Sequence, residues 1–222
     1  MEYRIAGEAF SHIEFNLKRG EKIRAESGSM IAMSPGVDID AKLAGGGIFG
    51  ALKSVIGGEG LFQTTYTAND DNAYLSIGPK TMGQIVDIKL NDEAYILQGG
   101  SFLASEMSLN LDTKFAGASG FLGGEGLFWL RVTGTGLTFV SSFGGIVKKQ
   151  LAPGEKFIVD SGNMVAFSGE CKFNIKKAAK GIVSSITSGE GLVIEFEGAG
   201  TVYYQTRNLG GFAYTLAPYF RG

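Results

Sequence analysis

Short segments in which apolar and polar residues alternate follow one another along most of the chain. Residues 2–7 and Ile13–Leu17 show this pattern, and after the turn-forming residues Lys18-Arg19-Gly20 the segment Glu21–Glu26 alternates charged and apolar side chains. A period of two places every second side chain on the same face of a strand, which predicts strands with one face on a core. The sequence therefore predicts an all-β protein of many short strands.

The predicted strands recur in the same order three times. In each copy, three strands precede a segment of variable length, a glycine-rich turn and two paired strands joined by turn-forming residues. After Gly210-Gly211 the chain closes with a last predicted strand from Phe212 to about Leu216. The leading strands are 13–17, 21–26 and 30–33, then 85–90, 94–97 and 102–104, then 146–151, 155–159 and 164–167. The paired strands are 61–68 with 73–77, 127–133 with 137–141, and 192–197 with 201–206, and their connections are 69–72, 134–136 and 198–200.

One motif marks the period of this pattern. Gly57-Gly58-Glu59-Gly60-Leu61-Phe62 returns as Gly123-Gly124-Glu125-Gly126-Leu127-Phe128 and as Ser188-Gly189-Glu190-Gly191-Leu192-Val193, so the glutamates are 66 and 65 residues apart. A nearly constant long period indicates an internal repeat. We therefore expect residues 1–222 to form a single domain of three internal repeats, at about 11–82, 83–144 and 145–222.

The repeated glutamates have two interpretations. Glycine on either side permits a positive φ, and a carboxylate can accept hydrogen bonds from nearby backbone N–H groups, so Glu59, Glu125 and Glu190 are expected to hold their own turns in shape. The alternative is that a threefold arrangement brings the three carboxylates together in a ring that binds a cation. We favour the structural interpretation, because a repeat more often preserves what folds each unit.

Composition narrows the class of protein. The chain has 35 Gly but only 4 Pro and 44% hydrophobic residues, which excludes a disordered low-complexity chain and, without a three-residue glycine period, collagen. A net charge of −2 gives no overall attraction to phosphate backbones or anionic lipids. Cys171 is the single cysteine, and no apolar run has the length of a secretory signal or of a membrane span of about 18 residues. We expect a cytoplasmic protein.

The motifs of catalysis and cofactor binding are weak or incomplete. Gly45-Gly46-Gly47-Ile48-Phe49-Gly50 matches G-x-G-x-x-G, but it lacks the flanking strand, helix and parallel strand of a dinucleotide site, and Gly50-Ala51-Leu52-Lys53-Ser54 misses the spacing of a phosphate-binding loop. His12 is the only histidine, which makes an imidazole metal site or a Ser-His-Asp triad improbable, and no G-x-S-x-G motif is present. We expect no enzyme, no catalytic residues, no cofactor and no bound metal.

Several motifs in fixed order resemble those of a known family. They are Phe102-Leu103-Ala104-Ser105, Gly124–Phe128, Val159–Phe167, Gly189–Val193 and Tyr203–Arg207, and they cover nearly the whole chain. The sequence resembles the bacterial branch of the altered inheritance of mitochondria family. This resemblance implies three β-rich repeats about a pseudo-threefold axis, with a fold similar to the trp RNA-binding attenuation protein and to double-stranded β-helices. It implies no established enzymatic activity and no catalytic residues.

Since the attenuation protein binds RNA, the lysines of the third copy need an explanation. Lys172, Lys176, Lys177 and Lys180 lie there, with Lys148-Lys149 earlier. RNA sites usually combine such lysines with exposed stacking aromatics, whereas Phe173 alone is interleaved here, in the alternation typical of a core residue. We interpret the lysines as guards of a strand edge and do not expect a nucleic-acid partner.

Apolar residues gather in the segments of variable length that precede the glycine-rich turns. In the first and third copies their spacing predicts a short amphipathic helix of two turns or fewer. Such a face needs a partner, so we expect a homo-oligomer or a protein partner, with membrane-surface contact as the less favoured alternative because the flanks lack Lys and Arg. The candidate interface residues are Ile48, Phe49, Leu52, Val55, Ile56, Phe121, Leu122, Ile182, Val183 and Ile186.

These observations favour a non-catalytic β-repeat protein that acts through self-assembly or partner binding. The alternative is a small-ligand or RNA-binding module that uses the groove between repeats.

Overall fold

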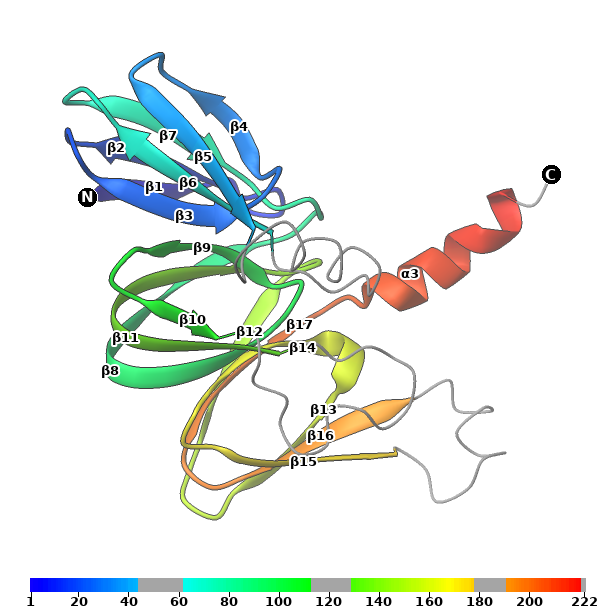
Figure 1. Ribbon diagram of the computed structural model, residues 1–222. Helices are drawn as coiled ribbons and strands as arrows, with labels where there is room; N and C mark the ends of the chain where they lie inside the picture. The colour runs from blue at the N-terminus through cyan, green and yellow to red at the C-terminus, as the bar shows by residue number, and fades with distance from the viewer. Residues whose placement is uncertain (44–61, 113–128, 178–190, 221–222) are drawn as a thin grey trace.

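The structure, a computed structural model, describes residues 1–43, 62–112, 129–177 and 191–220. Within these ranges the chain forms 17 strands, all paired antiparallel in three sheets, and one short helix near the C-terminus. The prediction of a mainly β protein is confirmed. Figure 1 shows three layers of strands stacked from one end of the molecule to the other, in chain order.

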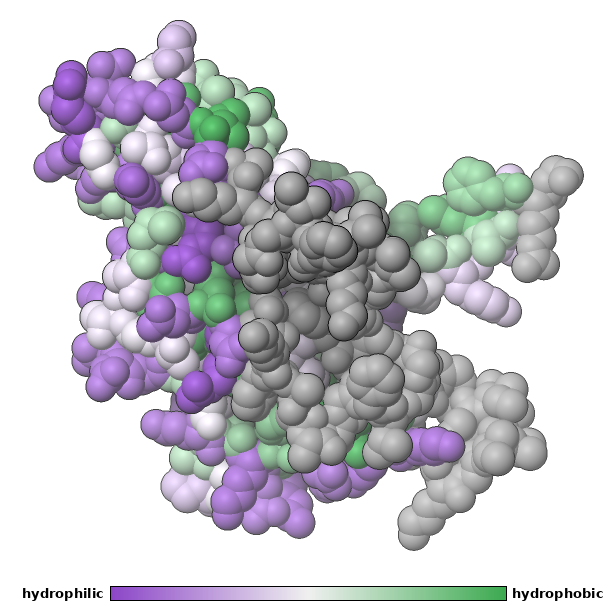
Figure 2. All heavy atoms as spheres, in the orientation of Figure 1, coloured by the Kyte–Doolittle hydropathy of each residue, from purple (hydrophilic) through white to green (hydrophobic). Residues whose placement is uncertain are grey.

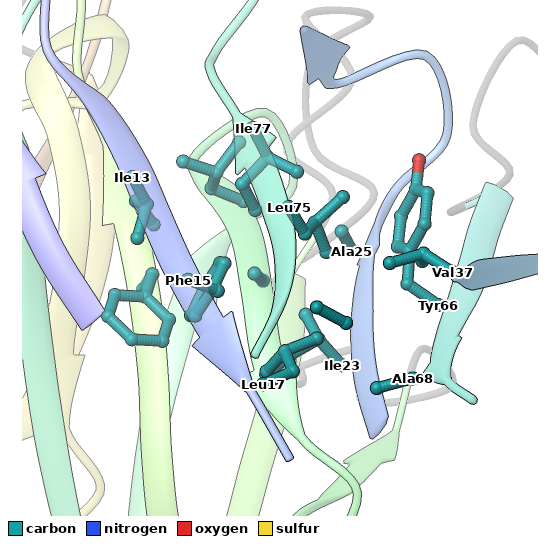
Figure 3. Close-up of a cluster of buried hydrophobic side chains, with 14 of the residues drawn as sticks. Ile13, Phe15, Leu17, Ile23, Ala25, Val37, Tyr66, Ala68, Leu75 and Ile77 are labelled. Atoms are coloured by element: carbon teal, nitrogen blue, oxygen red, sulfur yellow. The ribbon is translucent and has the colours of Figure 1, made fainter. Parts of the chain in front are cut away.

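The first section of the chain contains strands β1 to β7. In β2 the buried residues are Ile13, Phe15 and Leu17, so every second side chain enters the core as the alternation predicts. Figure 3 shows these side chains beside Leu75 and Ile77 of β7. The bounds are β1 Glu2–Ala6, β2 His12–Leu17, β3 Lys22–Glu26, β4 Met30–Met33, β5 Val37–Leu43, β6 Phe62–Ala68 and β7 Ala73–Ile77.

The second section is built from longer strands than expected. Its elements are β8 Ile85–Gln98, β9 Phe102–Glu106, β10 Asn110–Asp112 and β11 Trp129–Ser141. We predicted breaks at residues 91–93 and 134–136, but β8 and β11 run through both positions. The turn-forming residues make a bulge instead: Asp92 has φ 57°, its N–H donates to Thr135 Oγ1 at 3.0 Å, and the register shifts between Gly134 and Thr135.

The third section has separate, short strands again. Its elements are β12 Ile146–Leu151, β13 Lys156–Asp160, the 3-10 turn η1 Ser161–Asn163, β14 Met164–Ser168, β15 Lys172–Lys177, β16 Leu192–Glu197 and β17 Gly200–Gln205.

Two strand pairs join neighbouring sections. At the first junction β3 pairs with β9, and at the second junction β8 pairs with β14. They lie in a sheet of order β12-β17-β14-β8-β11-β9-β3-β6-β5, with β10 added on β11. The other sheets are β1-β2-β7-β4 and β13-β16-β15, and among the described strands none pairs the third section with the first. The pseudo-threefold axis and the three-repeat domain stay predictions.

Each core contains residues from two sections. The first cluster includes Leu103 from β9, the second includes Val165 from β14, and the third combines its own strands with Ile96 and Trp129 from the second section. Neighbouring sections are therefore held together by apolar packing as well as by backbone hydrogen bonds.

The predicted last strand at residues 212–216 is wrong, because this segment is helical. α3 spans Leu209–Leu216 and continues into the 3-10 turn η2 Ala217–Phe220. Asn208 begins the helix: its Oδ1 accepts from the Gly211 N–H at 3.1 Å, and its carbonyl accepts from the Phe212 N–H at 3.0 Å. Asparagine is among the best N-cap residues, and none of the described strands pairs with residues 209–216. No helix in the described ranges is long and apolar enough to cross a membrane.

Candidate functional site: grooves and open sheet edges

The site residues predicted from the sequence lie outside the part of the chain that the structure describes. The capping of turns, the cation ring and the interface at the insert tips therefore stay predictions. The residues concerned are Glu59, Glu125 and Glu190 of the repeated motif, and Ile48, Phe49, Leu52, Val55, Ile56, Phe121, Leu122, Ile182, Val183 and Ile186 of the inserts. The G-x-G-x-x-G match at residues 45–50 also falls there.

A groove of about 440 Å³ lies between the second and third sections. The bulge of β8 contributes Asp92 and Glu93, and the turn after β14 contributes Glu170. Opposite them, Thr201 Oγ1 donates to Gln150 Oε1 at 2.8 Å. Three carboxylates and no lysine or arginine line this groove, so it favours a small cationic or hydroxylated ligand and repels a phosphate backbone.

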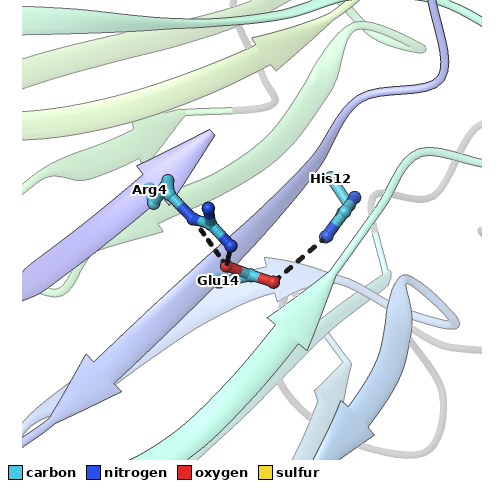
Figure 4. Close-up of polar contacts among 3 residues, drawn as sticks. All are labelled: Arg4, His12 and Glu14. Carbon is cyan, nitrogen blue, oxygen red and sulfur yellow. Dashed lines mark hydrogen bonds and ion pairs between the residues drawn. The ribbon is translucent and has the colours of Figure 1, made fainter. Parts of the chain in front are cut away.

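A second polar group occupies the outer face of β1 and β2. Arg4 Nε donates to Glu14 Oε2 at 2.8 Å, and His12 Nε2 lies 3.4 Å from Glu14 Oε1 (Figure 4). The hydrogen bond from Arg4 holds the pKa of Glu14 below its ordinary value. The adjacent groove, about 270 Å³, has no serine, threonine or cysteine in its lining, so it offers no hydroxyl or thiol nucleophile of those types.

The other chemically interesting residues have structural roles in the described part of the chain. Cys171 is buried, and burial raises the pKa of its thiol, which suppresses the reactive thiolate. Lys176 pairs with Glu195 at 2.8 Å, and Phe173 packs against Phe167 with ring centroids 5.0 Å apart. Among the described residues no group of three His, Cys, Asp or Glu side chains could hold a metal ion.

Two outer strands expose apolar side chains. β4 is the last strand of its sheet, and Met30 and Ile31 are 39% and 59% exposed. Figure 2 shows hydrophobic atoms on the surface where Figure 1 places β4. β13 is the last strand of the three-stranded sheet, and its Ile158 is 53% exposed. Natural sheets usually protect such edges with charges, proline or covering segments, so these two edges are candidate interaction sites.

The C-terminal helix is a third apolar surface. α3 and η2 contain no buried residue and no charged residue, and Phe212 contacts the body through Phe143, with ring centroids 5.3 Å apart. Figure 2 shows α3 as a hydrophobic projection from the body. Among the described residues, nothing covers its far side.

Sequence reasoning did not single out the edges of β4 and β13. One signal was present: Met30-Ile31-Ala32-Met33 is a continuous apolar run, and such a run is typical of a strand covered on both faces. In the structure Met30, Ile31 and Ala32 are exposed and β4 is paired at one edge only, so the run indicates a missing neighbour.

Comparisons with known proteins show a family, a relative and a solved structure to which this chain is similar. The family model described as "Mitochondrial biogenesis AIM24" matches residues 3–207. An uncharacterized protein of Streptococcus pyogenes serotype M6 is 34% identical over 218 residues, which cover 95% of this chain and 87% of the relative. The crystal structure of protein SPYM3_0169 from Streptococcus pyogenes is similar with a TM-score of 0.83 and 33% identity, covering 99% of each chain. The resemblance predicted from the motifs is confirmed.

Proposed function

We propose, from the premise that this chain belongs to the AIM24 family, that it acts through assembly with further copies of itself and not by catalysis. In this proposal each molecule consists of three repeats of one β unit, and each molecule pairs with a neighbouring molecule. The relative with 34% identity is described as uncharacterized, so its name assigns no reaction.

The strand pairings support the three-unit body. In the first and third sections the leading strand pairs with the closing strand, β2 with β7 and β12 with β17. The second of the leading strands pairs with the strand that precedes the closing strand, β3 with β6 and β13 with β16. In the second section the long strands β8 and β11 make both of these pairings at once. The same scheme of pairing thus occurs in each section, as a repeat requires.

The observation that carries the proposed function is the exposure of apolar residues on open strands. Ile31 on β4 and Ile158 on β13 are each more than half exposed, and both strands have backbone groups free to pair within the described residues. An exposed apolar edge is a template for adding another strand, and an assembly that uses it gains both backbone hydrogen bonds and apolar burial.

Sedimentation velocity of the full chain across the micromolar range tests this function. We expect the sedimentation coefficient to rise with concentration or to stay at the value of a stable oligomer. A monomer at every concentration would contradict the proposal, and attention would then turn to the ligand alternative.

That alternative is a small-ligand module, and one observation favours it. The acidic groove of about 440 Å³ has a volume within the usual range for small-molecule sites, roughly 300–1,000 Å³. Polyamines would suit its carboxylates. Thermal-shift measurements with these probes, and with Glu93→Gln as the matched variant, test it: a shift lost in the variant supports the site, and no shift in the wild type excludes it.

A further inference from the structure

The two junctions between sections use corresponding residues. At the first junction Ala25 of β3 lies opposite Ala104 of β9. At the second junction Leu97 of β8 lies opposite Ala166 of β14. In both cases the second strand of one section pairs antiparallel with the third strand of the next section. The junction is therefore a repeated structural element, to which the earlier section contributes its second strand and the later section its third strand.

The third strand of every section has a bulge at the same place. In β4 the register with β7 shifts between Met30 and Ala32, so Ile31 is the extra residue. The corresponding shifts leave Leu103 as the extra residue of β9 and Val165 as that of β14. Three bulges at one position indicate that the bulge serves the junction.

The extra residue of the bulge fills the core of the preceding section. Leu103 belongs to the core cluster of the first section and Val165 to that of the second, and both are 0% exposed. Among the described strands, none lies beside β4 at the corresponding edge, and Ile31 is 59% exposed. The difference between buried and exposed thus follows from the presence or absence of a neighbour, since the three positions are otherwise equivalent.

The other half of the junction shows the same contrast at the far end of the chain. Ile96 of β8 lies opposite Phe167 at the second junction and is 3% exposed. Ile158 has the corresponding position on β13 and is 53% exposed. The aromatic residue next to it, Phe157, is only partly buried against the third core. The third section therefore lacks the paired strand that the next section supplies at the first and second junctions.

We infer that the open edge of β13 pairs with the open edge of β4 in a second copy of this chain, and repeats the junction between molecules. The inference rests on the proposed function and names its contact. Transferring the register of the junctions places Val159 opposite Ala32 and Ile158 opposite Met33, with Ile31 of the second copy entering the third core of the first. Figure 1 shows β4 and β13 at opposite ends of the molecule, so the two edges of one chain do not meet in this structure.

Two further observations favour this pairing over others. Residues 27–37, which include β4, carry no charge, so β4 brings no ionised group into the contact. Among the described strands, the outer edges of β5, β10 and β15 have no partner in any of the three sections, so these open edges are a normal property of the unit and indicate no missing neighbour. Among the described strands, β4 and β13 are the ones that are open at an edge where both of their counterparts in the other sections are paired.

The assembly that results is heterologous. Each molecule offers one β13 edge and one β4 edge, so copies join head to tail and form a ring if the rotation closes, or a filament if it does not.

Lysine substitutions test the contact, because lysine on an edge strand is a common block to pairing. We expect Ile31→Lys and Ile158→Lys each to abolish the association measured by sedimentation velocity. In Ile158→Lys the new ammonium group faces Glu195 on β16, so the substitution suits its own sheet. Ile39→Lys is the matched control, since Ile39 is 48% exposed on the edge strand β5 and lies outside the contact. We expect it to leave association unchanged.

Mixing the two variants gives the sharpest outcome. Ile31→Lys keeps an intact β13 edge and Ile158→Lys keeps an intact β4 edge, so their mixture is expected to form a one-to-one dimer that grows no further. If both variants retain the wild-type oligomer, the inference is wrong but the proposed assembly stands through another surface. If the wild type is monomeric throughout, both are wrong.

A cross-link covers the case in which a lysine variant does not fold. Ile158→Cys and Met33→Cys, mixed and oxidised, are expected to give a disulfide-linked dimer, because directly opposed residues on antiparallel strands have Cβ atoms about 4.5–5.5 Å apart. The mixture of Ile158→Cys with Ile39→Cys is expected to stay uncross-linked. Equal cross-linking in the two mixtures, or none in either, would overturn the inferred register.

Discussion

Replacing Phe167 by alanine is expected to destabilise the third section strongly. Phe167 is 0% exposed on β14, and its ring contacts those of Trp129, Phe173 and Phe196 with centroids 5.7, 5.0 and 5.1 Å apart. Truncating a buried phenylalanine to alanine costs about 3–5 kcal/mol. Since each aromatic pair adds about 0.5–1.5 kcal/mol beyond area burial, we expect a loss at the upper end of that range.

Urea unfolding measures this loss, and the protein contains a suitable probe. Trp129 is the only tryptophan, is 2% exposed, and touches Phe167, so its fluorescence reports on this core. With a slope of about 1–3 kcal/mol per molar urea, the midpoint should fall by roughly 1.5 M or more. Far-UV circular dichroism follows the whole set of sheets, and coincidence of the two transitions tests whether the sections unfold together.

Phe10→Ala is the matched control, because the same side chain is removed at a position that is 70% exposed. We expect it to change the free energy of unfolding by less than about 0.5 kcal/mol. If the two variants unfolded at the same urea concentration with unchanged slopes, the assignment of Phe167 to a shared, tightly packed core would be refuted.

Three other predictions follow from local geometry. Gly83→Ala should lower stability by about 1–3 kcal/mol in thermal or urea unfolding, because its Cβ would lie 2.0 Å from a backbone oxygen, whereas Gly145→Ala, with its nearest atoms at 3.5 Å, should not. The hydrogen bond from the N-terminal ammonium group lowers the pKa of Glu21, so Glu21 stabilises the fold above its unfolded pKa; the stability difference between wild type and Glu21→Gln should vanish as the pH falls through the lowered pKa, and a difference that persists in acid would contradict this. Because burial raises the pKa of Cys171, a thiol reagent at neutral pH should modify it slowly in the native protein and rapidly in urea, and equal rates would show that the thiol is accessible.

The strands could be predicted from the sequence because their signal is local. Alternation at Ile13, Phe15 and Leu17 reflects which side chains enter the core, and it survives without knowledge of the partner strand. The segment from Phe212 to Leu216 misled because aromatic residues are common in strands, whereas the cap at Asn208 and the lack of a pairing partner decide for a helix.

The candidate site could not be predicted because it depends on pairing between distant parts of the chain. Ile31 and Leu103 occupy the same place in the same pattern, yet one is exposed and the other is buried. The difference is whether a preceding section lies beside the strand, and no local pattern records that. The residues at 91–93 show the same limit, since turn-forming residues also suit a bulge in a continuous strand.

The continuous strands β8 and β11 give the three sections different resistance to opening. In the outer sections a turn separates the strands of one sheet from those of the next, at residues 18–21 and 152–155, so one sheet can detach while the other stays paired. In the middle section the same two strands, β8 and β11, make both pairings within one sheet, so these pairings must open together. We therefore expect the two outer sections to open before the middle section. A neighbouring molecule bound at either end would stabilise the section that opens first.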